Sequence, residues 1–178
     1  MPGAVSPHSN KMNYTSTRSS LCVSFKEAFL EGLARDKGLY IPTRIPTLSI
    51  DSCSYLETSC KIFSLFCDLD STSLYSILEN SFFSFTFKDV VSIHNLDQNT
   101  CILELFHGPT FAFKDIALQV IANLLNHYKV TDKSVIVATS GDTGGAAIYA
   151  FKNTPLNIFV LFPLNRISSV QFNDIFMF

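Results

Sequence analysis

The order of apolar runs between residues 101 and 162 constrains the fold of this chain most. Short apolar stretches that predict strands alternate there with stretches whose apolar residues recur every three or four positions, which predict helices. In chain order, the predicted elements are Cys101–Leu105, Asp115–Tyr128, Ser134–Thr139, Thr143–Lys152 and Asn157–Phe162. Ser134–Thr139 has the continuous apolar character of a strand that is buried on both faces. This strand–helix–strand–helix–strand order predicts a parallel sheet wrapped by helices, the α/β class.

The part of the chain before residue 88 predicts helices instead. Three are expected, over Ser24–Gly38, over Cys53–Cys67, and from Asp70 or Ser71 onward. The first opens on a capping-box pattern made by Ser24 and Glu27, and Gly38 is expected to end it. A short extended piece, Leu39–Ile41, is predicted to follow. In the third helix the inward residues are expected to be Leu74, Ile77, Leu78 and Phe82.

We divide the chain accordingly into three parts. Residues 1–12 are predicted to be a disordered tail, because they are rich in proline, glycine, serine and asparagine. Residues 13–88 are predicted to be a mainly helical domain. Residues 89–178 are predicted to be the start of an α/β domain that is incomplete, since such sheets usually have about five or six strands. Residues 81–87 fit a helix end or a strand equally well.

Composition narrows the classes of partner. A net charge of -2 over 178 residues gives no reason to expect nucleic acid or an anionic membrane. No apolar run approaches the roughly 20 residues that span a bilayer. The five cysteines are odd in number and form no Cys-x-x-Cys pair, so neither a disulfide framework nor a metal site is favoured. Cys53, Cys60 and Cys67 recur every seven residues and could share one helix face, and we expect these three to be buried. The cysteines fit a protein of the reducing cytoplasm.

One loop places a lysine at the start of a predicted helix. It reads Glu104-Leu-Phe-His-Gly-Pro-Thr-Phe-Ala-Phe-Lys114-Asp115. Burial among apolar groups disfavours the charged form of an amine, and a neutral amine is what Schiff-base chemistry requires. A lysine there also opposes the helix dipole, a local cost that favours a functional role for Lys114. The alternative is a solvated surface lysine. His107, in the same loop, lies near the C-terminal edge of a predicted strand, where open α/β sheets bind ligands. The alternative is a turn histidine bonded to backbone.

A second loop, Ser140-Gly-Asp-Thr-Gly-Gly145, also joins a predicted strand to a predicted helix. Backbone amides at such a turn, aided by the helix dipole, bind carboxylate or phosphate groups. The glycines permit close approach and positive φ. The alternative is a tight connection in which Asp142 or Thr143 caps the helix. The loop lacks the lysine of a P-loop, so it does not predict a nucleotide site.

In this order and context, HGPTFAFKD followed by TSGDTGGAAI resembles threonine synthase, a fold-type II pyridoxal phosphate (PLP) enzyme family. Segments that resemble the N-terminal domain of that family are Tyr14–Arg18, Val23–Phe25, Gly32–Ala34 and Gly38–Pro42. The resemblance covers roughly residues 13–171. It implies the N-terminal part of a longer enzyme that converts O-phosphohomoserine and water to threonine and phosphate.

The resemblance also implies roles for individual residues. Lys114 is expected to be the catalytic lysine that holds the cofactor, with Ser140 and Asp142 beside it. The residues expected to contact a small-molecule substrate are Thr110, Ser140, Gly141, Asp142, Thr143 and Gly144. Asp115 is expected to be structural, favourably placed at a helix N-terminus.

Departures from the family leave alternatives open. The family usually has Asp-Gly-Gly where this chain has Asp36-Lys37-Gly38, which bears on turn geometry. The glycine-rich loop that cradles the cofactor phosphate lies later in the family, so we expect this chain alone to be inactive. The alternatives are a threonine synthase-like phospho-lyase with another phosphorylated substrate, and a noncatalytic product. The residues do not predict the oligomeric state.

Overall fold

The computed structural model describes residues 11–50, 53–163, 168, 169 and 173. The chain forms two compact units, Met1–Leu74 and Tyr75–Phe178. Most of the predicted tail lies outside the described residues, but Met12, which we placed in it, is buried. The predicted domain boundary at residue 88 stays a prediction.

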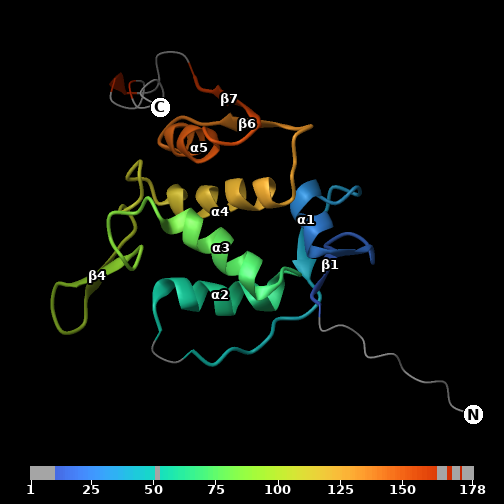
Figure 1. Cartoon of the computed structure of the whole chain (residues 1–178), viewed down its shortest axis with the longest axis horizontal. Helices are drawn as coiled ribbons and strands as arrows, with labels where there is room; N and C mark the ends of the chain where they lie inside the picture. Colours follow the sequence, from blue (N-terminus) through green and yellow to red (C-terminus); the bar gives the residue numbers. More distant parts are fainter. Residues whose placement is uncertain (1–10, 51–52, 164–167, 170–172, 174–178) are drawn as a thin grey trace, which may run out of the picture. The chain divides into compact units, whose positions relative to one another are not determined.

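The first unit contains a small antiparallel sheet that the sequence did not reveal. Strands β1 (Asn13–Ser16), β2 (Cys22–Ser24) and β3 (Tyr40–Pro42) pair in the order β2-β1-β3 (Figure 1). Only β3 coincides with a predicted extended piece. Strands of three or four residues are too short to show alternation, and they form because a distant segment supplies their hydrogen bonds.

The first helix confirms its predicted start but not its predicted end. Helix α1 (Phe25–Glu31) begins with the complete capping box of Ser24 and Glu27. It ends at Gly32, which adopts φ +71°, rather than at Gly38. Gly32 is the first position where a residue without Cβ lets the chain leave the helix at positive φ.

The next two helices agree with the prediction. Helix α2 (Tyr55–Phe66) has its own capping box, made by Ser54 and Glu57. Helix α3 (Ser71–Phe82) is capped by Asp70, whose Oδ1 accepts from the Ser73 N–H at 2.9 Å. Residues 81–87, for which a helix end and a strand were both considered, contain the end of α3 at Phe82 and no strand. The residues expected to face inward are buried at Leu74, Ile77 and Leu78 and half-buried at Phe82.

The cysteines are less buried than predicted. All five are free thiols, and only Cys67 is buried. Cys53 and Cys60 are half-buried, while Cys22 and Cys101 are exposed. The seven-residue spacing of three of them follows helix α2, but the middle of that helix has no fully buried residue. Burial raises the pKa of the Cys67 thiol, which keeps it in its neutral form.

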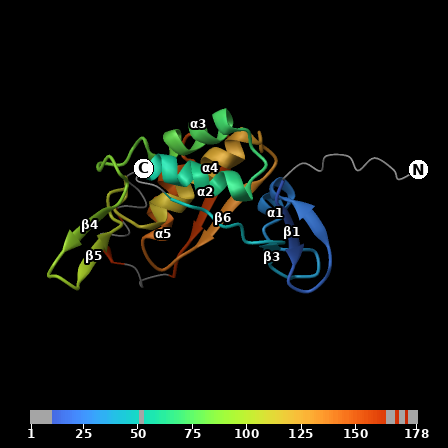
Figure 2. The same ribbon diagram turned by 90° about the horizontal axis from the view of Figure 1, so that it is seen from below.

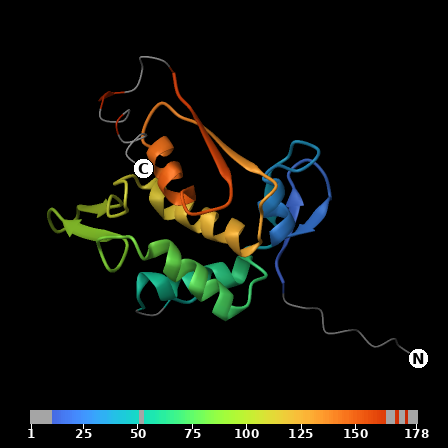
Figure 3. The ribbon, with the colours of Figure 1, turned by 45° about the horizontal axis from the view of Figure 1, so that its top comes forward.

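The second unit contains the predicted parallel pair. Strands β6 (Ser134–Ala138) and β7 (Asn157–Leu161) are parallel and in register, Ser134 opposite Asn157. Helix α4 (Lys114–His127) precedes them and helix α5 (Thr143–Phe151) connects them. Helix α5 packs against α4 and against both strands (Figure 3). The α/β class is therefore confirmed.

The first predicted strand of that sheet was assigned wrongly. β5 (Cys101–Glu104) pairs antiparallel with β4 (Ser92–Asn95) in a separate hairpin. Figure 2 shows this hairpin extending away from α4 and α5. The intervening turn closes through hydrogen bonds from the Leu96 N–H to the Thr100 carbonyl and from the Asn99 N–H to Asp97. A local turn of this length brings neighbouring strands together antiparallel.

The parallel strands are also less buried than their sequence predicts. One face of the pair is half-buried, and on the other Ile136, Phe159 and Leu161 are 55–68% exposed. Helix α5 covers a single face, so the apolar residues of these strands are shielded from solvent on one side only. No helix in the described part of the chain is both long and apolar enough to cross a membrane.

The turn in which the chain departs from the family is strained. Lys37 adopts φ +64°, in the left-handed region that disfavours residues with a Cβ. Its N–H donates to the Ala34 carbonyl at 2.8 Å, which holds it there. Gly38 has no room for a side chain, because a Cβ would lie 2.1 Å from Ser16 Oγ. The glycine that the family has at position 37 would fit this backbone without strain.

We therefore expect Lys37→Gly to raise the free energy of unfolding by about 0.5–1 kcal/mol. Relief of left-handed strain, about 1–2 kcal/mol, exceeds the conformational entropy that glycine adds to the unfolded state. Urea denaturation followed by circular dichroism measures the change. Lys37→Ala is the matched control, since it removes the long side chain but keeps the Cβ and should give no gain. Equal gains from both variants would assign the effect to the side chain instead.

Candidate functional site

A buried carboxylate organises the loop that leads to Lys114. Asp115 is completely buried, and its two oxygens accept from the Thr110 N–H and the Thr110 hydroxyl, both at 2.8 Å. Gly108 lies against the same carboxylate, where a Cβ would come within 2.4 Å of Oδ2. The loop between Gly108 and α4 is thus folded around Asp115, as its expected structural role requires.

Burial raises the pKa of Asp115, because desolvation penalises the charged carboxylate. The two hydrogen bonds from Thr110 act in the opposite direction but are outweighed. The neighbouring Asp142 carboxylate raises the pKa further. Protonation of the Asp115 carboxyl group is therefore more favourable in the folded chain than it would be in water.

The loop is strained just before the lysine. Phe111 adopts φ +60°, a backbone conformation that is unfavourable for a bulky residue. Its side chain is also 73% exposed to solvent. The Phe111 N–H donates to the Gly108 carbonyl, and the Asp115 N–H donates to the Ala112 carbonyl. Residues held in such a conformation by their surroundings are concentrated at binding and catalytic sites.

The structure brings the two loop motifs together. Lys114 Nζ lies 2.8 Å from Asp142 Oδ1, although the two residues are 28 positions apart. Lys114 is the first residue of α4, and Asp142 is the N-cap residue of α5. The two helices start side by side, so the amine and the carboxylate meet at their N-terminal ends.

The apolar burial that we expected around Lys114 is not found. Its side chain is 30% exposed. The neighbouring Phe113 is 57% exposed, with its ring 4.3 Å from the lysine nitrogen. Lys114 stands at the edge of a groove of about 390 Å³ with mostly apolar walls. The groove is lined by Phe113, Lys114, Ile116, Ala117, Leu118 and Thr143.

This groove was missed at the level of sequence. The residues that follow Lys114 have the spacing of a helix core, and nothing in their pattern distinguishes a core position from the wall of an open groove. The structure reveals it through Phe111 and Phe113, which are both exposed beside the lysine, since large exposed apolar groups in a cluster mark binding surfaces.

The glycine-rich loop differs in detail from the prediction. The Gly141 N–H donates to Thr139 Oγ1 at 3.0 Å, so it is engaged within the loop rather than directed at a ligand. Gly144 and Gly145 are buried inside helix α5, where they permit close helix packing rather than positive φ. Asp142 makes no side-chain capping bond. Ser140 is exposed and Thr143 borders the groove.

His107 contacts side chains rather than the backbone acceptor of the turn-histidine alternative. Its Nε2 lies 3.1 Å from Glu104 Oε2 and 3.2 Å from Ser92 Oγ. Ser92 also donates to Glu104, and this bond is the main reason why the pKa of Glu104 is lowered. Both partners meet the same ring nitrogen, so the arrangement is not that of a catalytic triad. It ties the hairpin to the start of the Lys114 loop.

Comparison with known proteins agrees with the motifs. A family model described as "Threonine synthase N terminus" matches residues 13–82. Threonine synthase of Schizosaccharomyces pombe is 37% identical over 185 residues, which cover 92% of this chain and 36% of the relative. The structure of PLP-bound threonine synthase from Brucella melitensis is 37% identical with a TM-score of 0.82. That match covers 92% of this chain and 38% of the other.

The chain is similar to the N-terminal portion of threonine synthases. It spans little more than a third of the length of the relatives it matches. Threonine synthase-like 2 of Xenopus laevis is also similar, 34% identical over 174 residues, which cover 90% of this chain and 37% of that relative. The resemblance therefore includes threonine synthases and proteins named as threonine synthase-like.

The raised pKa of Asp115 predicts a stability that depends on pH. A carboxyl group with a raised folded pKa contributes stability that is full below the unfolded pKa of about 3.9 and is lost as pH rises through the folded value. Asp115→Asn does not titrate, and its amide can still accept from the Thr110 N–H. We expect the stability of the variant relative to the unsubstituted chain to increase as pH rises from about 3.5 toward neutrality.

Urea denaturation at a series of pH values measures this difference. Asp132→Asn, at an exposed aspartate of the same unit, is the control and should show no such trend. A relative stability of Asp115→Asn that falls with rising pH would mean that the Thr110 hydrogen bonds outweigh burial, contrary to our interpretation.

Proposed function

We propose that Lys114 is the cofactor lysine of a PLP-dependent enzyme that converts O-phosphohomoserine and water to threonine and phosphate. The observation that carries the proposal is the 2.8 Å contact between Lys114 Nζ and Asp142 Oδ1. It joins, at one place in the fold, the two motifs on which the family resemblance depends. The reaction is proposed for the whole protein, of which this chain spans the N-terminal portion.

The residues present suit this cofactor. A primary amine stands at the edge of an apolar groove, and the flanking Phe113, Ile116 and Leu118 side chains offer the apolar walls that an aromatic ring requires. Thr143, the first residue of α5, borders the same groove. When bound, PLP supplies an electron sink that stabilises negative charge on substrate carbon.

Asp142 has a role that follows from its position. Asp142 Oδ1 lies 2.8 Å from Lys114 Nζ and forms an ion pair with it. We therefore assign Asp142 as the group that positions the lysine at the groove while the site has no ligand.

Helix α5 supports a role in binding the substrate. The first N–H groups of a helix have no intrahelical partner, and at α5 they belong to Thr143 and Gly144, next to Lys114. These amides and the helix dipole favour a carboxylate there. Gly141 is a weaker candidate, because its N–H is bonded to Thr139. Thr110 is also weaker, since both of its donors are engaged by Asp115.

Two other functions remain in competition. One is a phospho-lyase that acts on a different phosphorylated substrate; the chain is also similar to a protein named threonine synthase-like 2, which keeps this alternative open. A noncatalytic product is the third candidate, since the chain spans only part of its relatives. Residence in the cytoplasm is part of the proposal and fits the free cysteines.

Borohydride reduction tests the assignment of Lys114. After incubation of the purified chain with PLP, we expect an absorption band in the visible range and, after reduction, a pyridoxyl label on the peptide that contains Lys114. Lys114→Ala should lose the label, while Lys88→Ala, at an exposed lysine of the same unit, should keep it. A folded chain that carries no specific label would support the noncatalytic alternative.

The role of Asp142 is tested by the rate of labelling. We expect Asp142→Ala to slow the labelling of Lys114 about tenfold, because the amine loses the contact that holds it at the groove. Asp132→Ala, at an exposed aspartate of the same unit, should leave the rate unchanged. An unchanged rate in Asp142→Ala would mean that the contact does not position the lysine.

Substrate titration separates the catalytic alternatives. We expect O-phosphohomoserine to change the visible spectrum of the PLP-loaded chain at concentrations at least tenfold lower than O-phosphoserine, a shorter phosphorylated amino acid. The reverse order would favour the phospho-lyase alternative. We expect no release of threonine by the chain alone, and threonine release would contradict that expectation.

A further inference from the structure

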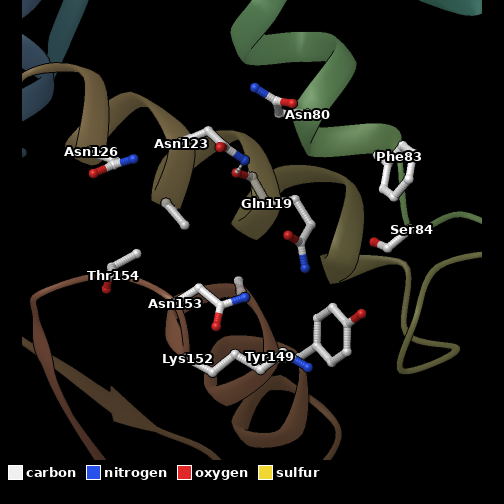
Figure 4. Close-up of a pocket in the computed structure, with 12 residues that line it drawn as sticks. Asn80, Phe83, Ser84, Gln119, Asn123, Asn126, Tyr149, Lys152, Asn153 and Thr154 are labelled. Carbon is white, nitrogen blue, oxygen red and sulfur yellow. Dashed lines mark hydrogen bonds between the residues drawn. The ribbon is translucent and has the colours of Figure 1, made fainter.

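A second pocket lies at the other end of helices α4 and α5. It has a volume of about 310 Å³ and is formed by the end of α3, the second half of α4 and the turn that follows α5 (Figure 4). Asn123, on its wall, lies nine residues after Lys114 on α4, about 13 Å along the helix at 1.5 Å per residue. The pocket is therefore separate from the Lys114 groove, although the same two helices form both.

Side-chain amides dominate the wall of this pocket. Five of the residues that line it are asparagine or glutamine, namely Asn80, Gln119, Asn123, Asn126 and Asn153. Each amide offers both a donor and an acceptor. Such a wall suits a molecule that itself carries donors and acceptors close together.

Gln119 shows that the pocket has unused hydrogen-bonding capacity. The residue is 7% exposed, and within the described part of the chain its Nε2 is buried without a hydrogen-bond partner. Figure 4 shows its side chain pointing from α4 into the space between α4 and α5. A buried donor without a partner is costly, and an acceptor supplied by a ligand would relieve that cost.

Asn123 is held in place by its own donors. Its Nδ2 donates to Ser81 Oγ at 3.1 Å and to the Gln119 carbonyl at 2.9 Å. Ser81 in turn donates to the Ile77 carbonyl. Both amide hydrogens are thus engaged, and Oδ1 is left as the acceptor that Asn123 can offer. The fixed geometry means that little side-chain entropy is lost when a ligand binds.

The charges around the pocket limit the class of ligand. No carboxylate is among the described lining residues, so a metal ion or a polyamine is disfavoured. Lys152 is the single cationic side chain among them, which is too few for a nucleotide or another polyphosphate. Its Nζ lies 3.7 Å from the centre of the Tyr149 ring. That contact occupies one face of the ring, on which a sugar would otherwise stack.

The ends of three helices add the opposite polarity. Helices α3, α4 and α5 end at Phe82, His127 and Phe151, next to the residues that line the pocket. The carbonyl groups at helix C-termini carry partial negative charge and favour a cation or a donor. The pocket thus combines the partial negative charge of these helix ends and the amide oxygens with the Lys152 ammonium and the Gln119 N–H.

We propose that this amide-lined pocket binds a free α-amino acid. Its carboxylate would be recognised by Lys152 and Gln119, and its ammonium group by Asn123 Oδ1 and the neighbouring helix ends. The pocket volume is sufficient for a small polar amino acid. The proposal does not depend on the function of Lys114.

Side-chain amide resonances report on this site directly. In the ¹⁵N-labelled chain without PLP, L-asparagine or L-serine should shift the Gln119, Asn123 and Asn126 side-chain signals in a saturable way. L-threonine is left out, because it is the product of the proposed reaction and could bind near Lys114. D-Glucose and inorganic phosphate are the comparison ligands, and neither should produce saturable shifts.

Substitutions separate this site from the Lys114 groove. Gln119→Met keeps the volume of the buried side chain and removes an amide without a partner, so the fold should be retained while affinity falls at least tenfold. Lys152→Met, at an exposed position, should weaken binding similarly, whereas Lys114→Ala should leave it unchanged. The absence of saturable shifts, shifts that persist in both Met variants, or equal shifts with D-glucose would overturn the proposal.

Discussion

The candidate site depends on one buried carboxylate. Asp115 accepts both donors of Thr110, excludes any side chain at position 108, and so fixes the path of the loop into helix α4. That path puts Lys114 at the first position of the helix, opposite Asp142. The carboxylate gains these bonds at the cost of desolvation, which its raised pKa records. Burial of the Asp115 carboxyl group therefore costs desolvation energy, and in return the loop holds Lys114 in a defined position.

The sequence predicted elements wherever the signal was local. The capping box of α1, the starts of α4 and α5, and the parallel strands β6 and β7 were predicted from a few adjacent residues, and the structure confirms them. The motif pair was also sufficient to bring Lys114 and Asp142 into one hypothesis. Local patterns of this kind are reliable because they depend on the backbone of a single segment.

The features that sequence could not reveal depend on partners far along the chain. Strands β1 and β2 are too short to show a period and exist because β3 completes their sheet. β5 joined the wrong sheet in our prediction, because its apolar pattern does not say which neighbour it pairs with. The exposure of Lys114 likewise depends on where Phe111 and Phe113 point, and their backbone is set by Asp115 rather than by their own preferences.

Helices α4 and α5 lie side by side with their N-termini at one pocket and their C-termini near another. Both pockets are therefore built on the same two helices. If a molecule in the amide-lined pocket changes the affinity at Lys114 by some factor, occupancy at Lys114 must change the affinity of that pocket by the same factor. Any such coupling would be reciprocal, whichever of the two pockets is filled first.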